Sequence, residues 1–402
     1  MLCIETLQRL LLNGAGFGVD LVDEGAGVLT VSIGDCPPLE RLGQMWRELE
    51  IRSDASFFLR WHWIGAWIEA MGMPTGQVLV RRGDEIVGLA LIHRSPDRWF
   101  GPLRRPALWL HEAGDPRLRS VAIEYNGVLA DRTVSSSVEE ACLRALAGLR
   151  QGDPLSWRAM TLGGVAVEWE TRCRRLGLKH RVHRRQPAPY ARLDSARDAL
   201  EGVSRNTRSQ IRRSMRLYQS RGGLTLRPAT TIDEARKMFD GLEQLHTSYW
   251  RSRGQGGAFA EPSFRRLHDR LLATAFPDGG ADLLEVQAGS GIVGYLYNFI
   301  CGGVVYAYQS GFLYEADARL KPGLVCHALA MNHYRHRGMR LYRFLAGDSR
   351  YKTSLADGGD ELVWLTCRHD DIAYRAETAG RALLGRLRNW AKGHGGGGSS
   401  EH

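Results

Sequence analysis

A cationic turn before an apolar helical segment is the clearest candidate for chemistry in this sequence. The turn at 319–323 reads RLKPG, and from Leu324 onward apolar residues recur at helical spacing. The first N–H groups of a helix have no partner inside the helix, and they carry the positive end of its dipole. Together with the side chains of Arg319 and Lys321, they would form a site suited to a pyrophosphate group.

Strands must flank this helix for the turn to be held in place. Residues 283–312 contain three runs of β-branched, aromatic and aliphatic residues, separated by glycine-containing turns at 289–291 and 302–303. This pattern is typical of an antiparallel meander of three short strands. The helix is expected to end near Gly338, and residues 340–346 are predicted to form a further strand.

The order of three strands, an R-x-x-x-G turn, a helix and a strand resembles the acyl-CoA half of the GNAT acetyltransferase superfamily. The pyrophosphate loop of that superfamily is usually written (Q/R)-x-x-G-x-(G/A); here Pro322 stands in place of the first glycine and Leu324 in place of the last small residue. With GF at 311–312 and FLAGDSRYK at 344–352, the stretch looks like the branch of cellulose-biosynthesis-type acetyltransferases, which are relatives of the Fem peptidoglycan aminoacyltransferases. The resemblance covers roughly residues 45–370.

The resemblance implies transfer of an acyl group, such as acetyl, from acyl-CoA to an amine of a small molecule, a peptide or a sugar precursor. The residues that would bind the acyl-CoA are Arg319, Lys321, Pro322, Gly323, Leu324, Gly311 and Phe312. Fem-like relatives imply aminoacyl-tRNA as an alternative donor. A binding or scaffold protein on a degenerate GNAT fold is a third reading, because a fold does not fix an activity.

Acyl transfer sets the demands on the catalytic side chains. An amine that attacks a thioester must lose a proton, the oxyanion must be stabilised, and the leaving thiolate must gain a proton. We expect Asp348 to act as the base or to orient the amine, Tyr351 to protonate the thiolate, and Lys352 to stabilise the oxyanion or to pair with Asp348. The alternative is a capped turn at 347–349, in which Asp348 only bonds to the backbone.

Further side chains are candidates for binding the substrate. Arg208 and Arg212 lie one turn apart on a basic helix predicted within 197–221, where they either clamp a phosphate or carboxylate or form a solvated face. Tyr306 and Tyr308 are predicted to share one face of their strand, so both would line an acceptor pocket or both would belong to the core.

Two helices are predicted within residues 232–275. They are joined by a glycine-rich segment at 252–257, and Trp250 beside this joint could cover an acceptor. His327, on the helix after the turn, is predicted to be a packing residue rather than a base. His333 and His336 lack a third ligand on their helix, so we expect no metal site.

A sequence pattern near the N-terminus repeats the one described above. Residues 77–94 resemble 283–301, with Ile86-Val87-Gly88 matching Ile292-Val293-Gly294. This predicts an α/β (α+β) protein with a duplicated GNAT-like fold, two mixed sheets flanked by helices, and a longer insertion in the first copy. Only the second copy has the glycine and the cations, so we place the cofactor there and assign structural and acceptor-binding roles to the first.

The expected domains follow from this duplication. They are residues 1–186, residues 187–370, and a C-terminal helix with a disordered tail at 371–402. The QPAP sequence at 186–189 is predicted to be a linker or crossover. A strand at 28–33, a helix at 39–50 and an aromatic helical segment at 56–70 are also predicted.

Composition sets only wide bounds. A chain of 402 residues is expected to form two domains, and a net charge of +10 favours anionic partners such as phosphorylated cofactors or tRNA. Seven scattered cysteines without a C-x-x-C pair predict reduced thiols and a cytoplasmic location. No apolar run reaches the ~20 residues that span a membrane. The acceptor and the oligomeric state are not determined by the sequence.

Overall fold

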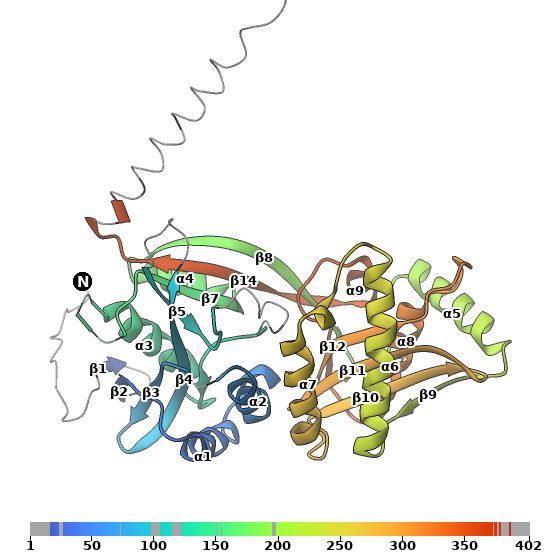
Figure 1. Ribbon diagram of the computed structural model, residues 1–402, viewed down its shortest axis with the longest axis horizontal. Coiled ribbons are helices and arrows are strands. Elements are labelled where there is room, and N and C mark those ends of the chain that lie inside the picture. The colour runs from blue at the N-terminus through green and yellow to red at the C-terminus, as the bar shows by residue number, and fades with distance from the viewer. Residues whose placement is uncertain are drawn as a thin grey trace, which may run out of the picture.

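The computed structural model describes most of the chain. The described residues are 17–23, 27–72, 74–97, 105–114, 121, 123–150, 152–153, 155–194, 198–372, 374–375, 378 and 386. They form two halves that lie side by side, with two long strands running across both (Figure 1).

The N-terminal half combines strands with helices that are mostly amphipathic. Its strands are β1 (Phe17–Asp23), β2 (Gly27–Gly34), β3 (Gly76–Arg82), β4 (Glu85–Asp97), β5 (Arg105–Leu110), β6 (Leu129–Ala130), β7 (Ala159–Ala166) and β8 (Lys179–Arg192). Its helices are α1 (Leu39–Glu50), α2 (Trp61–Met71), α3 (Ser135–Gly148) and α4 (Glu168–Arg175), with a 3₁₀ turn at Phe57–Leu59. The predicted helix at 39–50 is confirmed residue for residue.

The C-terminal half repeats this order. Its strands are β9 (Leu224–Pro228), β10 (Ala281–Ala288), β11 (Gly291–Cys301), β12 (Val304–Phe312), β13 (Leu341–Arg343) and β14 (Gly358–Arg368). Its helices are α5 (Arg205–Gln219), α6 (Ile232–Arg251), α7 (Pro262–Ala275), α8 (Pro322–His336) and α9 (Arg350–Leu355), with a 3₁₀ turn at Ala258–Ala260. The predicted meander and the helix after the cationic turn are therefore confirmed.

The duplicated fold is visible in the strand pairing. Each half has a strand, two helices, a hairpin, a third strand, a helix, a strand, a short helix and a last strand. In the first half the third strand is split, because β5 and β6 both pair with β4, and the described residues between them, 111–114, 121 and 123–128, belong to neither strand. This segment is the longer insertion that was predicted for the first copy.

The last strands of the two halves are exchanged. β14 pairs with β7 of the first half, and β8 pairs with β13 of the second, while β8 and β14 pair with each other. The strands of both halves therefore form one continuous mixed sheet rather than two separate ones. The QPAP segment at 186–189 lies within β8 and not in a loop, so it serves as the crossover between the halves.

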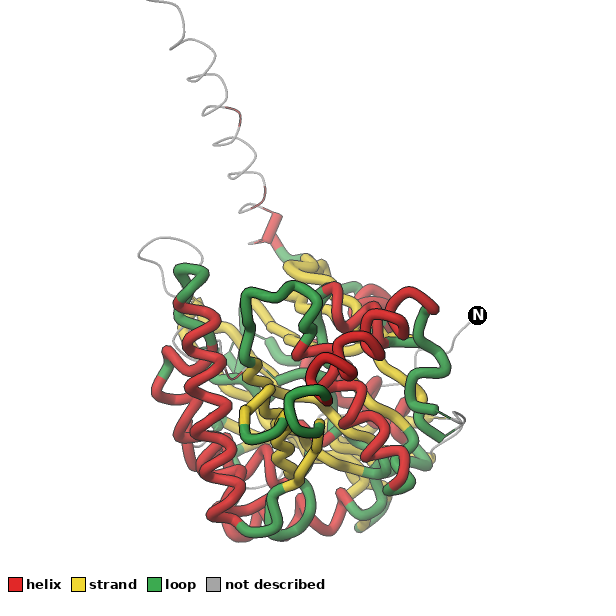
Figure 2. The backbone as a smooth tube through the Cα atoms, turned by 90° about the vertical axis from the view of Figure 1, so that its right-hand side faces the viewer, coloured by secondary structure: helices red, strands yellow, loops and turns green. Residues whose placement is uncertain are grey.

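Alternate residues of the meander face opposite layers of helices. Leu283, Tyr297 and Phe299 belong to one core with α1, α2, α6 and α7, whereas Leu284 and Leu296 belong to another with α5 and α8. Side chains alternate across a strand with a period of two, so the same strands supply both cores. Figure 2 shows the strands lying between helices on either side.

The first of these cores is shared by the two halves. The Phe57 ring stacks on Phe299, with ring centroids 4.2 Å apart and planes 5° from parallel. The Phe58 ring meets Tyr306 edge-on at 5.8 Å. The predicted aromatic segment at 56–70 is therefore buried in the joint between the halves.

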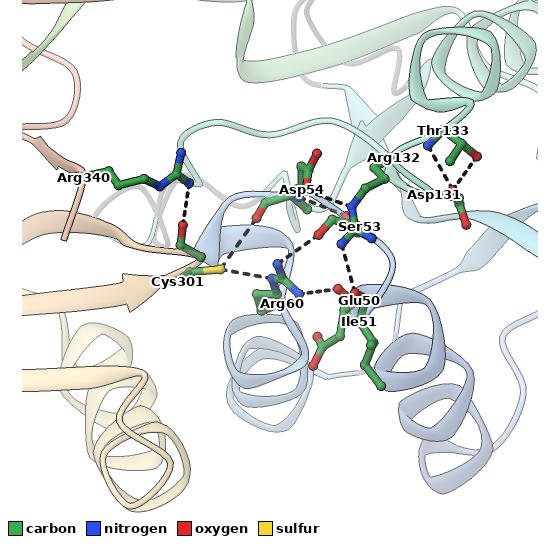
Figure 3. A network of polar contacts seen from close by, with 12 residues as sticks. Glu50, Ile51, Ser53, Asp54, Arg60, Asp131, Arg132, Thr133, Cys301 and Arg340 are labelled. Carbon is green, nitrogen blue, oxygen red and sulfur yellow. Dashed lines mark hydrogen bonds and ion pairs between the residues drawn. The ribbon is translucent and has the colours of Figure 1, made fainter. Parts of the chain in front are cut away.

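A polar network around Arg60 closes the same joint (Figure 3). The Arg60 guanidinium donates to the carbonyl oxygens of Glu50 and Ser53, and its Nε lies 3.1 Å from the Sγ of Cys301. The Cys301 thiol donates to the carbonyl of Ala55 at 3.7 Å. The end of β11 is thus tied to the segment between α1 and α2.

Candidate active site

Two parallel strands diverge in the C-terminal half. β12 pairs with β13 only where Val304–Tyr306 lies beside Leu341–Arg343, although β12 continues to Phe312. A bulge at Tyr308 interrupts the pairing of β12 with β11 on its other side. Bulges bend a strand and end its pairing. From residue 307 onward, the edge of β12 that faces β13 therefore carries backbone groups without a strand partner.

A cavity of about 250 Å³ lies at this divergence. Its walls come from β12, α7, α8, α9, the 3₁₀ turn at 258–260 and the residues that follow β13. One further lining residue, Glu124, comes from the insertion in the N-terminal half. The cavity is therefore built from both halves of the chain.

Glu124 and Lys352 hold the same piece of backbone at the cavity. The N–H of Ala346 donates to Glu124 Oε2 at 2.6 Å, and Lys352 Nζ donates to the carbonyls of Ala346 and Leu345 at 2.8 and 3.3 Å. Leu345 has a φ of +62°, a left-handed conformation that is costly for a branched side chain. The two side chains stabilise this turn, and the third N–H of Lys352 is left to face the cavity.

Burial shifts both of these groups toward their neutral forms. Burial raises the pKa of Glu124 against the opposing effects of the Ala346 N–H, Lys352 and Arg184. It lowers the pKa of Lys352 against the opposing charges of Glu124 and Asp348. The pKa of the carboxyl group and the pKa of the amine are thus shifted toward each other, as is common for groups at functional sites.

His327 presents an unpartnered nitrogen in the same place. Its Nδ1 lies 2.9 Å from the hydroxyl of Tyr342, while its Nε2 is buried without a partner and the ring lines the cavity. The ring stacks on Tyr351 at 5.2 Å. Burial lowers the pKa of His327 to about 3, so the imidazole is neutral at physiological pH.

The first turn of α8 keeps free N–H groups. The N–H of Lys321 donates to Ser214 Oγ of α5 at 2.9 Å, and Pro322 has no N–H to donate. Within the part of the chain that the structure describes, the N–H groups of Gly323 and Leu324 have no acceptor. A Cβ at Gly323 would come within 3.2 Å of the Phe312 ring. This helix start fits an anion, as the sequence predicts.

Residues 205–353 match the GNAT acetyltransferase domain family. The matched region runs from the first residue of α5 into α9, and it includes the start of α8 and most of the cavity wall. The cellulose-biosynthesis branch within this superfamily stays a prediction. No sequence among the curated proteins matches the chain.

Solved structures share the fold over most of the chain. One is the C-terminal domain (DUF2156) of a protein described as a lysylphosphatidylglycerol synthetase from Agrobacterium fabrum, with 11% identity, a TM-score of 0.51 and coverage of 86% of this chain and 96% of that one. Another is FemX, with 12% identity, a TM-score of 0.51 and coverage of 81% and 95%. At these identities the likeness shows the fold alone.

The proposed catalytic residues of the GNAT domain lie in different settings. Tyr351 and Lys352 both line the cavity, and burial raises the pKa of Tyr351. Asp348 is exposed and is not among the lining residues, although its charge acts on Lys352. The structure therefore places two of the three at the cavity and the third outside it.

The proposed cofactor residues gather around the start of α8. Gly311 and Phe312 end β12, and the Phe312 ring lies against Gly323. Leu324 follows in the first turn of the helix. The Arg319 side chain is exposed and donates to Asp317 at 2.7 Å, so this cation is already partly neutralised.

The proposed substrate-binding residues do not form one group. Tyr308 lines the cavity, and its hydroxyl lies 3.2 Å from His268 Nε2, whereas Tyr306 is buried against the N-terminal half. Both tyrosines still lie on one face of β12, because the Phe58 ring contacts Tyr306 at 5.8 Å and Tyr308 at 6.1 Å, although the two side chains line different cavities. Trp250 donates to His246 Nε2 at 2.9 Å and lies away from the cavity wall.

Arg208 and Arg212 lie on α5, beside the start of α8. The Arg208 guanidinium donates to the carbonyl of Glu201 at 3.1 Å, and Arg212 is exposed. The contact between Ser214 and Lys321 brings α5 against the helix start. Both arginines therefore lie on the helix that borders the predicted phosphate site.

A second cavity, of about 440 Å³, lies in the N-terminal half. It is bounded by the segment between α1 and α2, by β6, α3 and α4, and by Tyr306 and Arg343 of the other half. These elements correspond to those around the smaller cavity. Glu124 lines the smaller cavity and Tyr125 the larger, so the insertion forms part of the wall between them.

Glu112, on the same insertion, gives a test of buried charge. Burial raises the pKa of its carboxyl to about 7 from 4.5. Between pH 4.5 and about 7, the folded protein keeps the proton on the Glu112 carboxyl, whereas the unfolded chain releases it. The free energy of unfolding therefore falls as the pH rises through this range. We expect Glu112→Gln to stabilise the protein by roughly 2 kcal/mol at pH 8 and to have little effect at pH 4. Urea unfolding at the two pH values measures this, and an equal effect at both would contradict it.

Glu124 was missed by the sequence analysis. It lies in an irregular insertion about 220 residues from its partner Ala346, and neither periodicity nor a motif marks it. His327 was assigned to packing, and the structure adds a buried nitrogen that faces the cavity.

Within the described residues, no three His, Cys, Asp or Glu side chains gather closely enough to hold a metal ion. No helix there is long and apolar enough to span a membrane.

Proposed function

We propose that the protein is an N-acyltransferase that moves a small acyl group, such as acetyl, from acyl-CoA to an amine. One observation carries this proposal: the free N–H groups at the start of α8 lie at the same end of the GNAT domain as the cavity between β12 and β13. The helix start would hold the diphosphate of the donor, and the cavity would receive the thioester. A volume of about 250 Å³ suits a short acyl chain.

The side chains at the cavity supply the other needs of the reaction. Lys352 offers a free N–H beside the backbone groups of β12, and these can stabilise an oxyanion on the thioester carbonyl. Tyr351 lines the cavity and keeps its proton at neutral pH, so its hydroxyl is the proton donor that we assign to the leaving thiolate. Asp348 lies just outside and could orient an incoming amine.

We assign the acceptor to the 440 Å³ cavity in the N-terminal half, which Tyr306 and Arg343 of the C-terminal half also line. Its lining includes Glu139, which pairs with Arg172 at 2.8 Å, and Glu168, whose charge raises the pKa of Glu139. The whole lining holds three carboxylates, on Asp54, Glu139 and Glu168, and three guanidinium groups, on Arg132, Arg172 and Arg343. The carboxylates can pair with a cationic amine, and the lining has no excess of positive charge to attract a polyanion such as CoA. This supports the division into an acceptor side and a donor side, with the domain boundary inside β8.

A second donor class is supported by the surface of α5. Arg205, Arg208, Arg212 and Arg216 lie along the face opposite the buried residues of this helix, and α5 has no acidic residue. Like charges one turn apart destabilise a helix, so a polyanionic partner would compensate them. Aminoacyl-tRNA is therefore the alternative donor, with an amine or a lipid headgroup as its acceptor.

The free thiols support a reducing compartment. Of the cysteines in the described residues, Cys36, Cys142, Cys173, Cys301, Cys326 and Cys367 form no disulfide. A cytoplasmic location suits such a protein.

Gly323→Asp tests the donor site. A carboxylate at the start of α8 is compatible with the helix dipole but opposes a diphosphate at the same N–H groups. We expect calorimetry with acetyl-CoA to show binding by the wild type and at least a 100-fold weaker binding by the variant. Gly148→Asp is the control, because it places the same side chain at a helix end in the other half where nothing lies within 4 Å.

The two donors give different results in this experiment. Acetyl-CoA binding that is equal in the variant and the wild type would contradict the proposed site. If the wild type binds no acetyl-CoA but retains tRNA with an affinity that falls steeply as salt rises, the donor is aminoacyl-tRNA. If it binds neither, the protein is not an acyltransferase of either kind.

A further inference from the structure

The carboxyl group that lines the reaction cavity belongs to the other half of the chain. Among the described lining residues, Glu124 is the one acidic side chain. It reaches the cavity because the chain leaves the sheet between β5 and β6 and returns after 128. Its Oε2 is fixed by the Ala346 N–H, and its second oxygen is left without a hydrogen-bond partner in the described part of the chain.

We propose that Glu124 is the proton acceptor for the attacking amine, so that the N-terminal half supplies a catalytic residue to the GNAT domain. This inference rests on the proposed function and extends it. Glu124 lines the 250 Å³ cavity and its neighbour Tyr125 lines the 440 Å³ cavity, so the two sites meet at this pair of residues. In this proposal the amine extends from the 440 Å³ cavity past Tyr125 to the thioester beside Glu124. The insertion thus places both the acceptor amine and the base beside the acyl donor.

The groups at the cavity account for every bond and every proton in the reaction. Glu124 takes a proton from the ammonium of the acceptor, and the freed nitrogen lone pair forms a C–N bond to the thioester carbonyl carbon. The carbonyl electrons move to the oxygen and return as the C–S bond breaks. The thiolate takes a proton from Tyr351. Of the two protons on the attached nitrogen, one passes through solvent to restore Tyr351 and the other stays on the amide, and Glu124 releases its proton to solvent. No oxidant or further reactant is required.

Other groups at the cavity are less suited to this step. His327 is neutral, but a pKa of about 3 makes it too weak a base for an ammonium. Lys352 donates to two carbonyl oxygens and stays a donor. Asp348 lies outside the lining. The charged groups that act on Glu124 are Lys352 and Arg184, and both favour its ionised form.

Glu124→Gln separates catalysis from structure. The amide oxygen of Gln can still accept the Ala346 N–H, so the turn at Leu345 is kept, but the side chain cannot take a proton. With acetyl-CoA and the primary amine that the wild type uses best among glycylglycine, glucosamine and putrescine, we expect kcat to fall about 100-fold. The acetyl-CoA dissociation constant should stay within twofold, and Glu124→Asp should restore part of the rate.

Glu112→Gln is the matched control. Glu112 lies on the same insertion, is also influenced by Arg184, and lines neither cavity. We expect Glu112→Gln to keep the wild-type kcat. In the wild type and in Glu112→Gln, kcat/KM should fall as the pH is lowered, because the base becomes protonated. In Glu124→Gln we expect this fall of kcat/KM to disappear. A Glu124→Gln rate within twofold of wild type would overturn the inference while leaving the proposed function intact. A wild type that binds no acetyl-CoA would instead remove the proposed function, and the inference with it.

Discussion

Lys352→Met is expected to lower kcat for acyl transfer by a factor of about 100 to 1,000. The methionine side chain is of similar length, but it has no N–H to offer to a developing oxyanion. It also leaves the carbonyls of Leu345 and Ala346 without the donor that they have in the wild type. Because charge stabilisation in a water-poor site acts mainly on the transition state, the loss should lie in kcat rather than in donor affinity.

Single-turnover kinetics with acetyl-CoA measure this loss directly. Lys237→Met is the control, since Lys237 lies exposed on α6 and far along the chain from the cavity lining. Lys352→Arg keeps a cation and should recover part of the rate. If Lys352→Met kept kcat but raised the acetyl-CoA dissociation constant, Lys352 would be a donor-binding residue and not an oxyanion donor.

Phe299→Ala should destabilise the protein by about 3–5 kcal/mol. The Phe299 ring is fully buried, stacks on Phe57, and contacts the edges of Phe58 and Trp63. All three partners belong to the N-terminal half, so the cavity left by the substitution would open in the joint between the halves. We expect calorimetry to show one unfolding transition for the wild type and a lower Tm for the variant.

Ile51→Ala is the control for Phe299→Ala. Ile51 follows α1 in the N-terminal half and is 77% exposed, so its truncation should change the free energy of unfolding by less than about 0.5 kcal/mol. Equal losses for the two variants would mean that the shared core does not join the halves. Two separate unfolding transitions in the wild type would also mean that the shared core does not join the halves.

Local patterns were enough to predict much of the fold. The hydrophobic spacing in α1, the glycine turns between β10, β11 and β12, and the RLKPG turn before α8 each act over a few residues, and each is confirmed. The duplication was also visible, because the Ile-Val-Gly sequence occupies the same place in both hairpins. Periodicity and turn preference depend only on residues that are close together in the sequence.

Contacts between distant segments were not predictable in this way. No strand was predicted at 358–368, and the QPAP sequence at 186–189 was expected to be a linker or crossover. Proline cannot donate to a ladder, yet Pro187 and Pro189 lie in β8 and accept bonds from Gly347 and Phe344 through their carbonyls. Only the three-dimensional exchange of strands explains this placement.

The exchange of last strands has a consequence for synthesis of the chain on the ribosome. β7 ends at residue 166, but its neighbour β14 begins at residue 358, so almost 200 further residues must be translated before this edge can be paired. An unpaired edge of this length invites association with other chains. Completion of the first half is thus delayed until β14 has been translated, and the nascent protein would benefit from a chaperone during that interval.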